Sequence, residues 1–461
     1  MTNSTGKWFR IFTGFFLLTA LSASLLAAPA AAGTAPTHWV ATWGAAMQIP
    51  EPQNALAPAD LDHATLRQLV HLSLGGSLLR IRVSNAFGTA PLRLEAVHVA
   101  RAISLANPAQ TNSAQTSWAQ ATSAIDPATD RPVLFAGQPS VVIPAGAEYV
   151  SDPVQMNVAP LSTLAITLSI PDAPAQQTGH PGSRATTWIA HGVSVSAAQM
   201  PEAQTSAAPT TDATTPDAQA SGTQTSGAKT IEHWYFISGV DVAAPQSAAI
   251  IAFGDSITDG HAATTNGNDR WTDDLAARLQ ASPTTRSLSV INVGIGGNHL
   301  LTDGLGPNAL ARFDRDVLAR PAAKYLLVLE AINDLGALSR MPDATPAQHT
   351  DLQARLIAAY QQIITRAHAA GLTAIGGTLT PWVGSGYYHP DAASEADRQA
   401  LNAWIRTPGH FDAVVDFDRA VRDPADPERM LPALDSGDHL HPSPAGYKAM
   451  ADAIPLSLFA Q

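Results

Sequence analysis

Two short segments, far apart in the sequence, carry the residue types of a serine nucleophile and its base. Gly254-Asp255-Ser256 directly follows an apolar run, so the Ser256 hydroxyl is expected on a turn between a strand and a helix. Near the other end of the chain, the spacing of Asp438 and His441 lets the carboxylate orient one imidazole nitrogen while the other faces a nucleophile. These residues could together carry out acyl transfer, with His441 as the base.

Each segment also has a simpler interpretation when it is taken alone. A serine after a strand is often only a helix N-cap, and the G-x-S-x-G motif is not satisfied because Thr258 stands where its last glycine belongs. The C-terminal segment could instead bind a metal, or form an exposed polar loop, through two aspartates and two histidines: Asp435, Asp438, His439 and His441.

Two middle segments add candidate hydrogen-bond donors. Residues 292–298 form a glycine-rich turn after an apolar run, and such a turn can direct backbone N–H groups at an anion. A dinucleotide-binding fingerprint is excluded there because His299 occupies the position of its third glycine. Asn333 follows the next apolar run and could point an amide into the same cleft, although an Asn-Asp pair is also typical of a turn.

The elements that must position these residues alternate between strands and helices. Five apolar runs predict strands over residues 249–253, 288–293, 325–329, 372–378 and 413–417. Apolar stripes between them predict helices, one of which runs from Leu352 to Ala367 and is followed by Gly371 at a C-cap position. This alternation predicts a parallel sheet with helices on both faces, whose active site lies beyond the carboxyl ends of the strands.

The preceding part of the chain reads as β structure. Residues 164–170 alternate large apolar residues with small or polar ones, which predicts a half-buried strand, and similar runs separated by turn residues predict a β-sandwich. Residues 201–229 contain almost no large apolar side chains, so we expect a disordered loop inside this domain. The predicted organisation is a β-domain over residues 33–245 and an α/β domain over residues 246–461.

Composition and the N-terminus limit the cellular context. A net charge of −12 over 461 residues gives the chain no general attraction to nucleic acid, and the absence of cysteine excludes disulfides and thiolate chemistry. Lys7 and Arg10 precede a broken apolar run that ends in small residues before Gly33. This pattern predicts a cleaved signal peptide over residues 1–32 and a secreted or periplasmic protein without stable membrane insertion. A membrane anchor is the alternative, but the run falls short of the roughly 20 residues that a span requires.

In these motifs the second half of the chain resembles the SGNH superfamily of GDSL esterases and lipases. The ordered matches are residues 253–260, Gly297, Asn333, and Asp438 with His441. The resemblance implies a flavodoxin-like α/β/α domain and an oxyanion hole formed by the N–H groups of Ser256 and Gly297 with the Asn333 amide. The family's third block usually has glycine where this chain has Ala331.

The start of the β-domain, residues 39–43, is similar to a bacterial subgroup of arylesterases and carbohydrate esterases, which implies a jelly-roll-like β-sandwich. The implied reaction is hydrolysis of short acyl esters of carbohydrate or aryl alcohols, small or polymeric, without a metal or organic cofactor. A lipase for longer acyl chains and a non-catalytic carbohydrate-binding protein are the alternatives. Candidate substrate-binding residues are Asp255 and three aromatic residues of the loop after the fourth strand, which could equally be ordinary loop residues: Trp382, Tyr387 and Tyr388.

Overall fold

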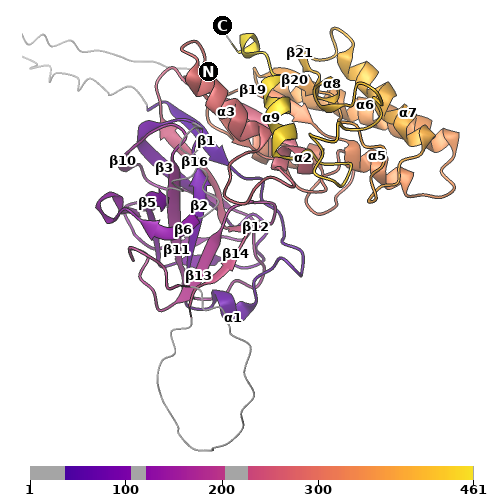
Figure 1. Cartoon of the computed structure of the whole chain (residues 1–461). Coiled ribbons are helices and arrows are strands. Elements are labelled where there is room, and N and C mark those ends of the chain that lie inside the picture. Colours follow the sequence, from indigo (N-terminus) through magenta and orange to yellow (C-terminus); the bar gives the residue numbers. More distant parts are fainter. Residues whose placement is uncertain (1–36, 105–120, 203–226, 460–461) are drawn as a thin grey trace, which may run out of the picture. The chain divides into compact units, whose positions relative to one another are not determined.

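The computed structural model describes residues 37–104, 121–202 and 227–459 (Figure 1). His38–Gln461 form one compact unit. The expected signal peptide, residues 1–32, lies outside the described residues, and so does most of the expected disordered loop, residues 203–226.

The described chain up to residue 243 is almost entirely β structure, as the sequence predicts (Figure 1). Two antiparallel sheets have the strand orders β14-β13-β2-β11-β5-β6, with β7 beside β5, and β1-β16-β3-β10, with β9 beside β3. Their strands are β1 (Trp39–Gly44), β2 (Ala64–His71), β3 (Gly76–Ser84), β5 (Ala96–Ser104), β6 (Ala121–Ile125), β7 (Arg131–Val133), β9 (Glu148–Val150), β10 (Val154–Val158), β11 (Thr163–Ile170), β13 (Thr187–His191), β14 (Lys229–Ile231) and β16 (Ile237–Ala243). Two short pairs and one helical turn complete this region: β4 (Leu92–Leu94) with β8 (Val141–Ile143), β12 (Gly179–His180) with β15 (Trp234–Tyr235), and α1 (Pro58–Leu61).

The central strand β11 corrects one detail of the prediction. Its alternating sequence predicts a half-buried strand, but every residue except Ser169 is buried. Leu164 and Ile166 lie in the main core, whereas Ala165 on the opposite face packs in a second, smaller apolar cluster that includes Trp188. The small and polar residues of β11 therefore face a covered surface and not solvent.

A single backbone conformation divides the apolar segment of residues 234–237 between two strands. Phe236 has φ of +62°, a left-handed conformation that ends β15 before β16 begins. As a result β15 pairs with β12, while β16 joins the sheet that contains β1 and β3. Strand β12, which is held by β15, also carries His180. The ring of this histidine reaches Asp259 in the other half of the molecule.

The second half contains the five-stranded parallel sheet that the sequence predicts. Its order is β18-β17-β19-β20-β21, so the first strand lies between the second and the third, as in doubly wound sheets. The strands are β17 (Ala248–Gly254), β18 (Leu288–Asn292), β19 (Ala323–Leu329), β20 (Thr373–Gly377) and β21 (Ala413–Val415). A neighbouring pair of strands whose connections leave in opposite directions opens a crevice at their carboxyl ends.

The helices of this half fall into two groups. Helices α3, α8 and α9 contact one another, whereas α6 contacts α4 and α7, and α5 contacts α7. The longest, α6, begins at a capping box between Thr345 and Gln348, and Gly371 follows its end with φ of +76°, as expected from the sequence. The helices are α2 (Ser256–Asp259), α3 (Trp271–Ala281), α4 (Ala309–Phe313), α5 (Ile332–Ser339), α6 (Pro346–Ala369), α7 (Ala392–Arg406), α8 (Phe417–Val421) and α9 (Pro444–Asp452). Among the described residues, none of the helices has the length and apolar character of a membrane span.

Buried contacts join the β-rich half to the α/β half. Strand β1 packs against β17 and β18, and one main core includes apolar residues from both halves. Polar bonds cross the same boundary, because the Ser289 hydroxyl donates to Ala41 O at 2.6 Å and Val290 N donates to Ser73 Oγ at 3.0 Å. The two halves therefore share one interior.

Candidate active site

Ser256 lies at the carboxyl end of the central strand β17. Asp255 caps the single turn of α2 by accepting a hydrogen bond from Ile257 N at 2.9 Å, and Gly260 ends that turn with φ of +99°. A side chain at Gly254 would lie 2.2 Å from Thr258 Oγ1 and 2.5 Å from Leu329 O, so only glycine allows the turn to fold this tightly. The turn presents the Ser256 hydroxyl at the edge of the sheet with 7% of the residue exposed.

The C-terminal segment brings a histidine to this hydroxyl. Ser256 Oγ lies 2.8 Å from His441 Nε2, and His441 Nδ1 lies 2.6 Å from Asp438 Oδ2. Because a carboxylate can only accept, Nδ1 carries the hydrogen and Nε2 is left as the acceptor for the serine hydroxyl.

Asp438 is held as a charged acceptor although it is partly buried. Its other oxygen accepts the N–H groups of Leu440 at 2.9 Å and His441 at 2.8 Å. Burial opposes the charged form, but the hydrogen bonds from His441 and its neighbour outweigh it and hold the pKa of Asp438 well below its usual value. Ser256, His441 and Asp438 thus have the arrangement of a serine-hydrolase triad, which can act as nucleophile, base and orienting carboxylate.

The two middle motifs of the sequence, which contain Gly297 and Asn333, follow β18 and β19, the two strands that flank β17. Gly297 has φ of +68°, and its N–H has no acceptor among the described residues. Asn333 donates from Nδ2 to Asn298 O at 2.7 Å, which leaves the second hydrogen of its amide uncommitted in the described structure. The Asn298 carbonyl can only accept and so sets which way the amide faces, and Tyr388 donates its hydroxyl to Asn333 Oδ1 at 2.5 Å and holds it there.

A buried arginine ties these motifs together, and the sequence analysis did not single it out. Arg312 on α4 donates to Gly254 O at 2.9 Å, to Val293 O at 2.6 Å and to Asn298 Oδ1 at 2.8 Å. It also pairs with the buried Glu330 at 3.1 Å. Burial, together with the nearby Asp255, raises the pKa of Glu330 well above its usual value. Arg312 therefore joins the ends of β17 and β18 to the glycine-rich turn.

His261 is a second residue that the sequence analysis missed, although it lies only five positions after Ser256. Its ring packs against that of His441, with 4.1 Å between the centroids, and its Nδ1 accepts a hydrogen bond from Arg184 at 3.0 Å. Partial burial, followed by the positive charges of His441 and Arg184, lowers the pKa of His261 to about 4. The base is thus flanked by an imidazole that stays neutral at pH 7.

Ala331 has a strained backbone. This residue, which stands where the family usually has glycine, adopts φ of +93° at the N-cap of α5 and is fully buried. An L-residue in this region of φ costs about 1–3 kcal/mol. The conformation explains why glycine is usual at this position.

Two of the predicted substrate-binding residues, Trp382 and Asp255, are fully buried and present no surface to a substrate in this structure. Trp382 is fully buried and donates from its indole nitrogen to Glu395 Oε2 at 3.0 Å, so it belongs to the packing between its loop and α7. Asp255 is also fully buried, and burial raises its pKa to about 7. Tyr388 is nearly buried behind Asn333, whereas Tyr387 is 62% exposed with the Arg340 guanidinium 3.8 Å from its ring centre.

The metal alternative retains only Asp438 and His441 of the residues that the sequence suggests. His439 pairs with Asp435 at 2.7 Å and is separate from the pair formed by His441. Within the described ranges, the group with ligand atoms close enough for a metal is His261, Asp438 and His441, whose ligand atoms lie within 4.8 Å of one another. An ion there would have to displace the hydrogen bond from His441 to its carboxylate and face the Arg184 guanidinium.

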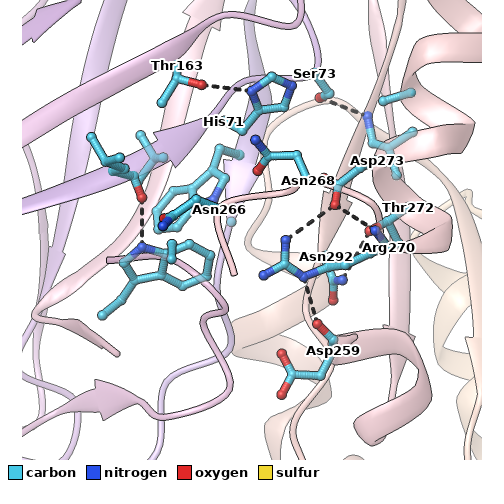
Figure 2. Close-up of a pocket in the computed structure, with 18 of the residues that line it drawn as sticks. His71, Ser73, Thr163, Asp259, Asn266, Asn268, Arg270, Thr272, Asp273 and Asn292 are labelled. Atoms are coloured by element: carbon cyan, nitrogen blue, oxygen red, sulfur yellow. Dashed lines mark hydrogen bonds and ion pairs between the residues drawn. The ribbon is translucent and has the colours of Figure 1, made fainter. Parts of the chain in front are cut away.

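A polar cavity of about 50 Å³ lies beside the site, where the β-rich half meets the α/β half (Figure 2). His71 and Thr163 line it from the β-rich half, while Asp259 and Arg270 line it from the other. Arg270 Nε donates to Asp259 O at 2.8 Å, and its guanidinium also reaches Ser183 O in the β-rich half. The cavity is therefore lined by both halves.

Comparisons with known proteins match the second half of the chain. Residues 252–449 match the GDSL-like Lipase/Acylhydrolase family. A GDSL-like lipase from Bacteroides thetaiotaomicron is 17% identical, with a TM-score of 0.33 over 46% of this chain and 87% of that one. An acetylxylan esterase from Geobacillus stearothermophilus is 20% identical, with a TM-score of 0.34 over 45% of this chain and 91% of that one. The curated proteins contain no significant match.

Proposed function

Because residues 252–449 match the GDSL-like Lipase/Acylhydrolase family, we propose that the protein hydrolyses carboxylic esters through a covalent intermediate on Ser256. The observation that carries the proposal is the hydrogen-bonded series from the Ser256 hydroxyl through His441 to Asp438. Ester hydrolysis itself follows from the family, and the roles of the individual residues are the proposal.

The mechanism begins with proton transfer. His441 Nε2 accepts the proton of Ser256 Oγ as the oxygen attacks the substrate carbonyl carbon, and the carbonyl π electrons move onto its oxygen. Asp438 stabilises the imidazolium that forms. When the tetrahedral intermediate collapses, the bond to the leaving alkoxide breaks and His441 protonates it. Water then repeats the sequence on the acyl-enzyme, which releases the acid and restores the serine.

Three donors are available for the negative charge that develops on the carbonyl oxygen. They are the N–H of Ser256, which as the first residue of α2 has no intrahelical acceptor, the N–H of Gly297, and the Asn333 amide. Loss of one such donor costs about 3–4 kcal/mol, or roughly 100- to 1000-fold in rate.

The proposed substrates are short acyl esters of carbohydrate or aryl alcohols. Access to the nucleophile is narrow, because Ser256 is only 7% exposed and the Leu305 side chain packs against the Gly297 turn, where an added Cβ would lie 2.9 Å from Leu305 Cδ1. A narrow entrance favours an acetyl group over a long acyl chain, which would require an extended apolar channel.

The experiment that tests this function is hydrolysis of 4-nitrophenyl esters from acetate to decanoate by the wild type and by Ser256→Ala. We expect the highest kcat/KM for acetate and loss of at least about 10⁴-fold in the variant. EDTA in every assay removes metal-dependent hydrolysis. Undiminished activity of Ser256→Ala would exclude the proposed nucleophile, and a maximum at decanoate would favour a lipase.

We also propose that residues 1–32 are an export signal and that the β-rich half is a jelly-roll-like sandwich. The charged N-terminus, the broken apolar run and the small residues before Gly33 support export. Sequencing the N-terminus of the exported protein tests the signal, and we expect it to begin at Gly33.

A further inference from the structure

His180 is a buried histidine of the β-rich half that reaches the catalytic half. It lies at the end of β12, is 2% exposed and stacks on Trp234 with 5.6 Å between the ring centroids. Its Nδ1 lies 2.8 Å from Ala46 O, and its Nε2 lies 2.9 Å from Asp259 Oδ1. Because a carbonyl and a carboxylate can only accept, the geometry requires hydrogen on both ring nitrogens.

The partner of His180 belongs to the turn that carries the nucleophile. Asp259 is the last residue of α2, three positions after Ser256, and is 6% exposed. A carboxylate buried to this degree needs a cation or several donors, because an unpaired buried charge is very costly. Burial lowers the pKa of His180, but the charge of Asp259 and its hydrogen bond outweigh that effect and leave the pKa above its ordinary value. His180 therefore supplies the positive charge.

The second oxygen of this carboxylate holds the glycine-rich turn. Asp259 Oδ2 accepts the N–H of Gly296 at 3.1 Å, and Gly296 directly precedes Gly297, a proposed oxyanion donor. Two adjacent glycines have wide conformational freedom, so the direction of the Gly297 N–H depends on what anchors the turn. Two hydrogen bonds anchor the turn. Ile295 N donates to Gly254 O at 3.0 Å just before the two adjacent glycines, and the N–H of the first of them donates to Asp259.

The close approach of the backbone shows how tightly this carboxylate is enclosed. A Cβ at Gly182, in the β-rich half, would lie 1.9 Å from Asp259 Oδ2, and a Cβ at Gly294 would lie 2.3 Å from Asp259 N. A side chain at Gly182 would displace the carboxylate, and one at Gly294 would displace the backbone of Asp259. The carboxylate is thus fixed between the β-rich half on one side and the glycine-rich turn on the other.

We propose that His180 is a positioning residue for ester hydrolysis: through Asp259 it fixes the Gly296–Gly297 turn so that the Gly297 N–H faces the developing oxyanion. The proposal rests on the proposed function, since it assigns the oxyanion role to Gly297. It also gives the β-rich half a part in catalysis that does not require contact with the substrate.

The test uses two substitutions that separate the two bonds of His180. His180→Gln keeps a donor near the position of Nε2, which faces Asp259, and gives up the bond to Ala46 O. His180→Asn keeps a donor near the position of Nδ1 and gives up the bond to Asp259. His71→Gln is the matched control, because His71 is a partly buried histidine that lines the cavity beside Asp259 and bonds to Thr163 and not to Asp259.

We expect His180→Asn to lower kcat for 4-nitrophenyl acetate about 10- to 100-fold, somewhat less than the loss of a donor, with KM changed less than about 3-fold. Inhibition by an aryl trifluoromethyl ketone, whose adduct with serine carries an oxyanion, should weaken by a similar factor. His180→Gln should recover most of both losses, and His71→Gln should resemble the wild type. A purely structural role would lower the amount of folded enzyme without weakening inhibitor binding per active site.

The proposal is overturned if His180→Asn retains kcat within about 2-fold, if the Gln variant is as impaired as the Asn variant, or if kcat falls while inhibitor binding does not. If His180→Asn does not fold, Asp259→Asn takes its place, because it keeps the size of the side chain and removes the charge that binds His180. The same loss of kcat and of inhibitor affinity is then expected, and its absence overturns the proposal. Failure of the wild type to hydrolyse the ester would instead contradict the proposed function.

Discussion

Asn333 has both ends of its side-chain amide engaged: Nδ2 donates to Asn298 O and Oδ1 accepts the Tyr388 hydroxyl. An amide can rotate by 180° and exchange donor and acceptor, but the Asn298 carbonyl can only accept and so selects the orientation with Nδ2 toward it. The Tyr388 hydroxyl donates to Oδ1 and holds the amide in that orientation. Tyr388 therefore contributes to the proposed oxyanion hole without touching the substrate. The sequence analysis placed this tyrosine among residues that stack on a substrate.

Tyr388→Phe is predicted to lower kcat about 10-fold, because a buried acceptor left without its donor costs about 1–3 kcal/mol and the amide loses its fixed orientation. Steady-state hydrolysis of 4-nitrophenyl acetate measures the effect. Tyr387→Phe is the matched control, since Tyr387 is the exposed neighbour and contacts Arg340. Equal activity of both variants would show that the hydroxyl of Tyr388 does not orient the amide.

His261 makes a prediction about acid stability. Its pKa of about 4 in the folded protein lies below the ordinary value near 6.5, so between these values the unfolded chain binds a proton that the folded protein does not. Stability is therefore lost as the pH falls from about 6.5 to about 4, and this loss is complete below the lower value. His261→Gln should reduce the loss.

Urea unfolding at pH 7 and at pH 5 measures this difference for the wild type and the variant. His389→Gln, which removes a histidine from an exposed loop, is the control. The assignment is wrong if His261→Gln and the wild type lose the same unfolding free energy between the two pH values.

At the scale of elements, the carboxyl ends of β17 and β18 are joined by Arg312 on α4. Its guanidinium binds carbonyls at both strand ends and pairs with two buried carboxylates, those of Glu330 and Asp316. Removing one member of such a group leaves buried charges and carbonyls without partners. The sheet edge therefore depends on this one side chain for its polar interactions.

Arg312→Met is predicted to lower the free energy of unfolding by about 3–5 kcal/mol, which is typical for breaking a buried pair. Urea denaturation followed by tryptophan fluorescence measures it. Arg355→Met removes an exposed arginine that pairs with Asp351 on α6, and it should cost at most about 1 kcal/mol. A loss for Arg312→Met as small as that of the control would contradict the role given to the cluster.

The elements themselves were largely accessible from the sequence. The predicted runs at 249–253 and 288–293 lie within two residues of the observed β17 and β18, because buried parallel strands are continuous apolar segments between turn residues. The strand β11 was assigned to the right place but with one face wrongly exposed, since a small cluster around Trp188 covers it. Local alternation does not reveal what packs against the second face of a sheet.

The sequence predicts only those candidate site residues that lie in short motifs. Ser256, Asp438 and His441 stand in short recognisable spacings, whereas Arg312 and His180 act through partners such as Gly254 and Asp259, which lie 58 and 79 positions away in sequence. Trp382 was misassigned because an aromatic residue in a glycine-containing loop has the same local sequence whether it is exposed or packed. Its partner Glu395 lies on the following helix, 13 positions later, and only folding brings the two together.

At the scale of the whole molecule, the shared core and the polar bonds between the halves predict a single cooperative unfolding transition. Separation of the halves would expose apolar residues of β1 and β18 and leave Asp259 without His180. Differential scanning calorimetry should give one peak whose van't Hoff and calorimetric enthalpies agree. Two resolved peaks would instead support independent domains that meet at residue 245.

The backbone at Gly182, in the first half, lies so close to the Asp259 carboxylate that a methyl group on this residue would not fit. Attempts to recombine this hydrolase with other N-terminal modules therefore face a steric requirement as well as a chemical one. A grafted module must place a glycine like Gly182 and a protonated histidine like His180 against Asp259, or Asp259 itself must be replaced. We expect chimeras that provide neither feature to fold less stably than the parent chain, because they leave the buried Asp259 carboxylate without its cation.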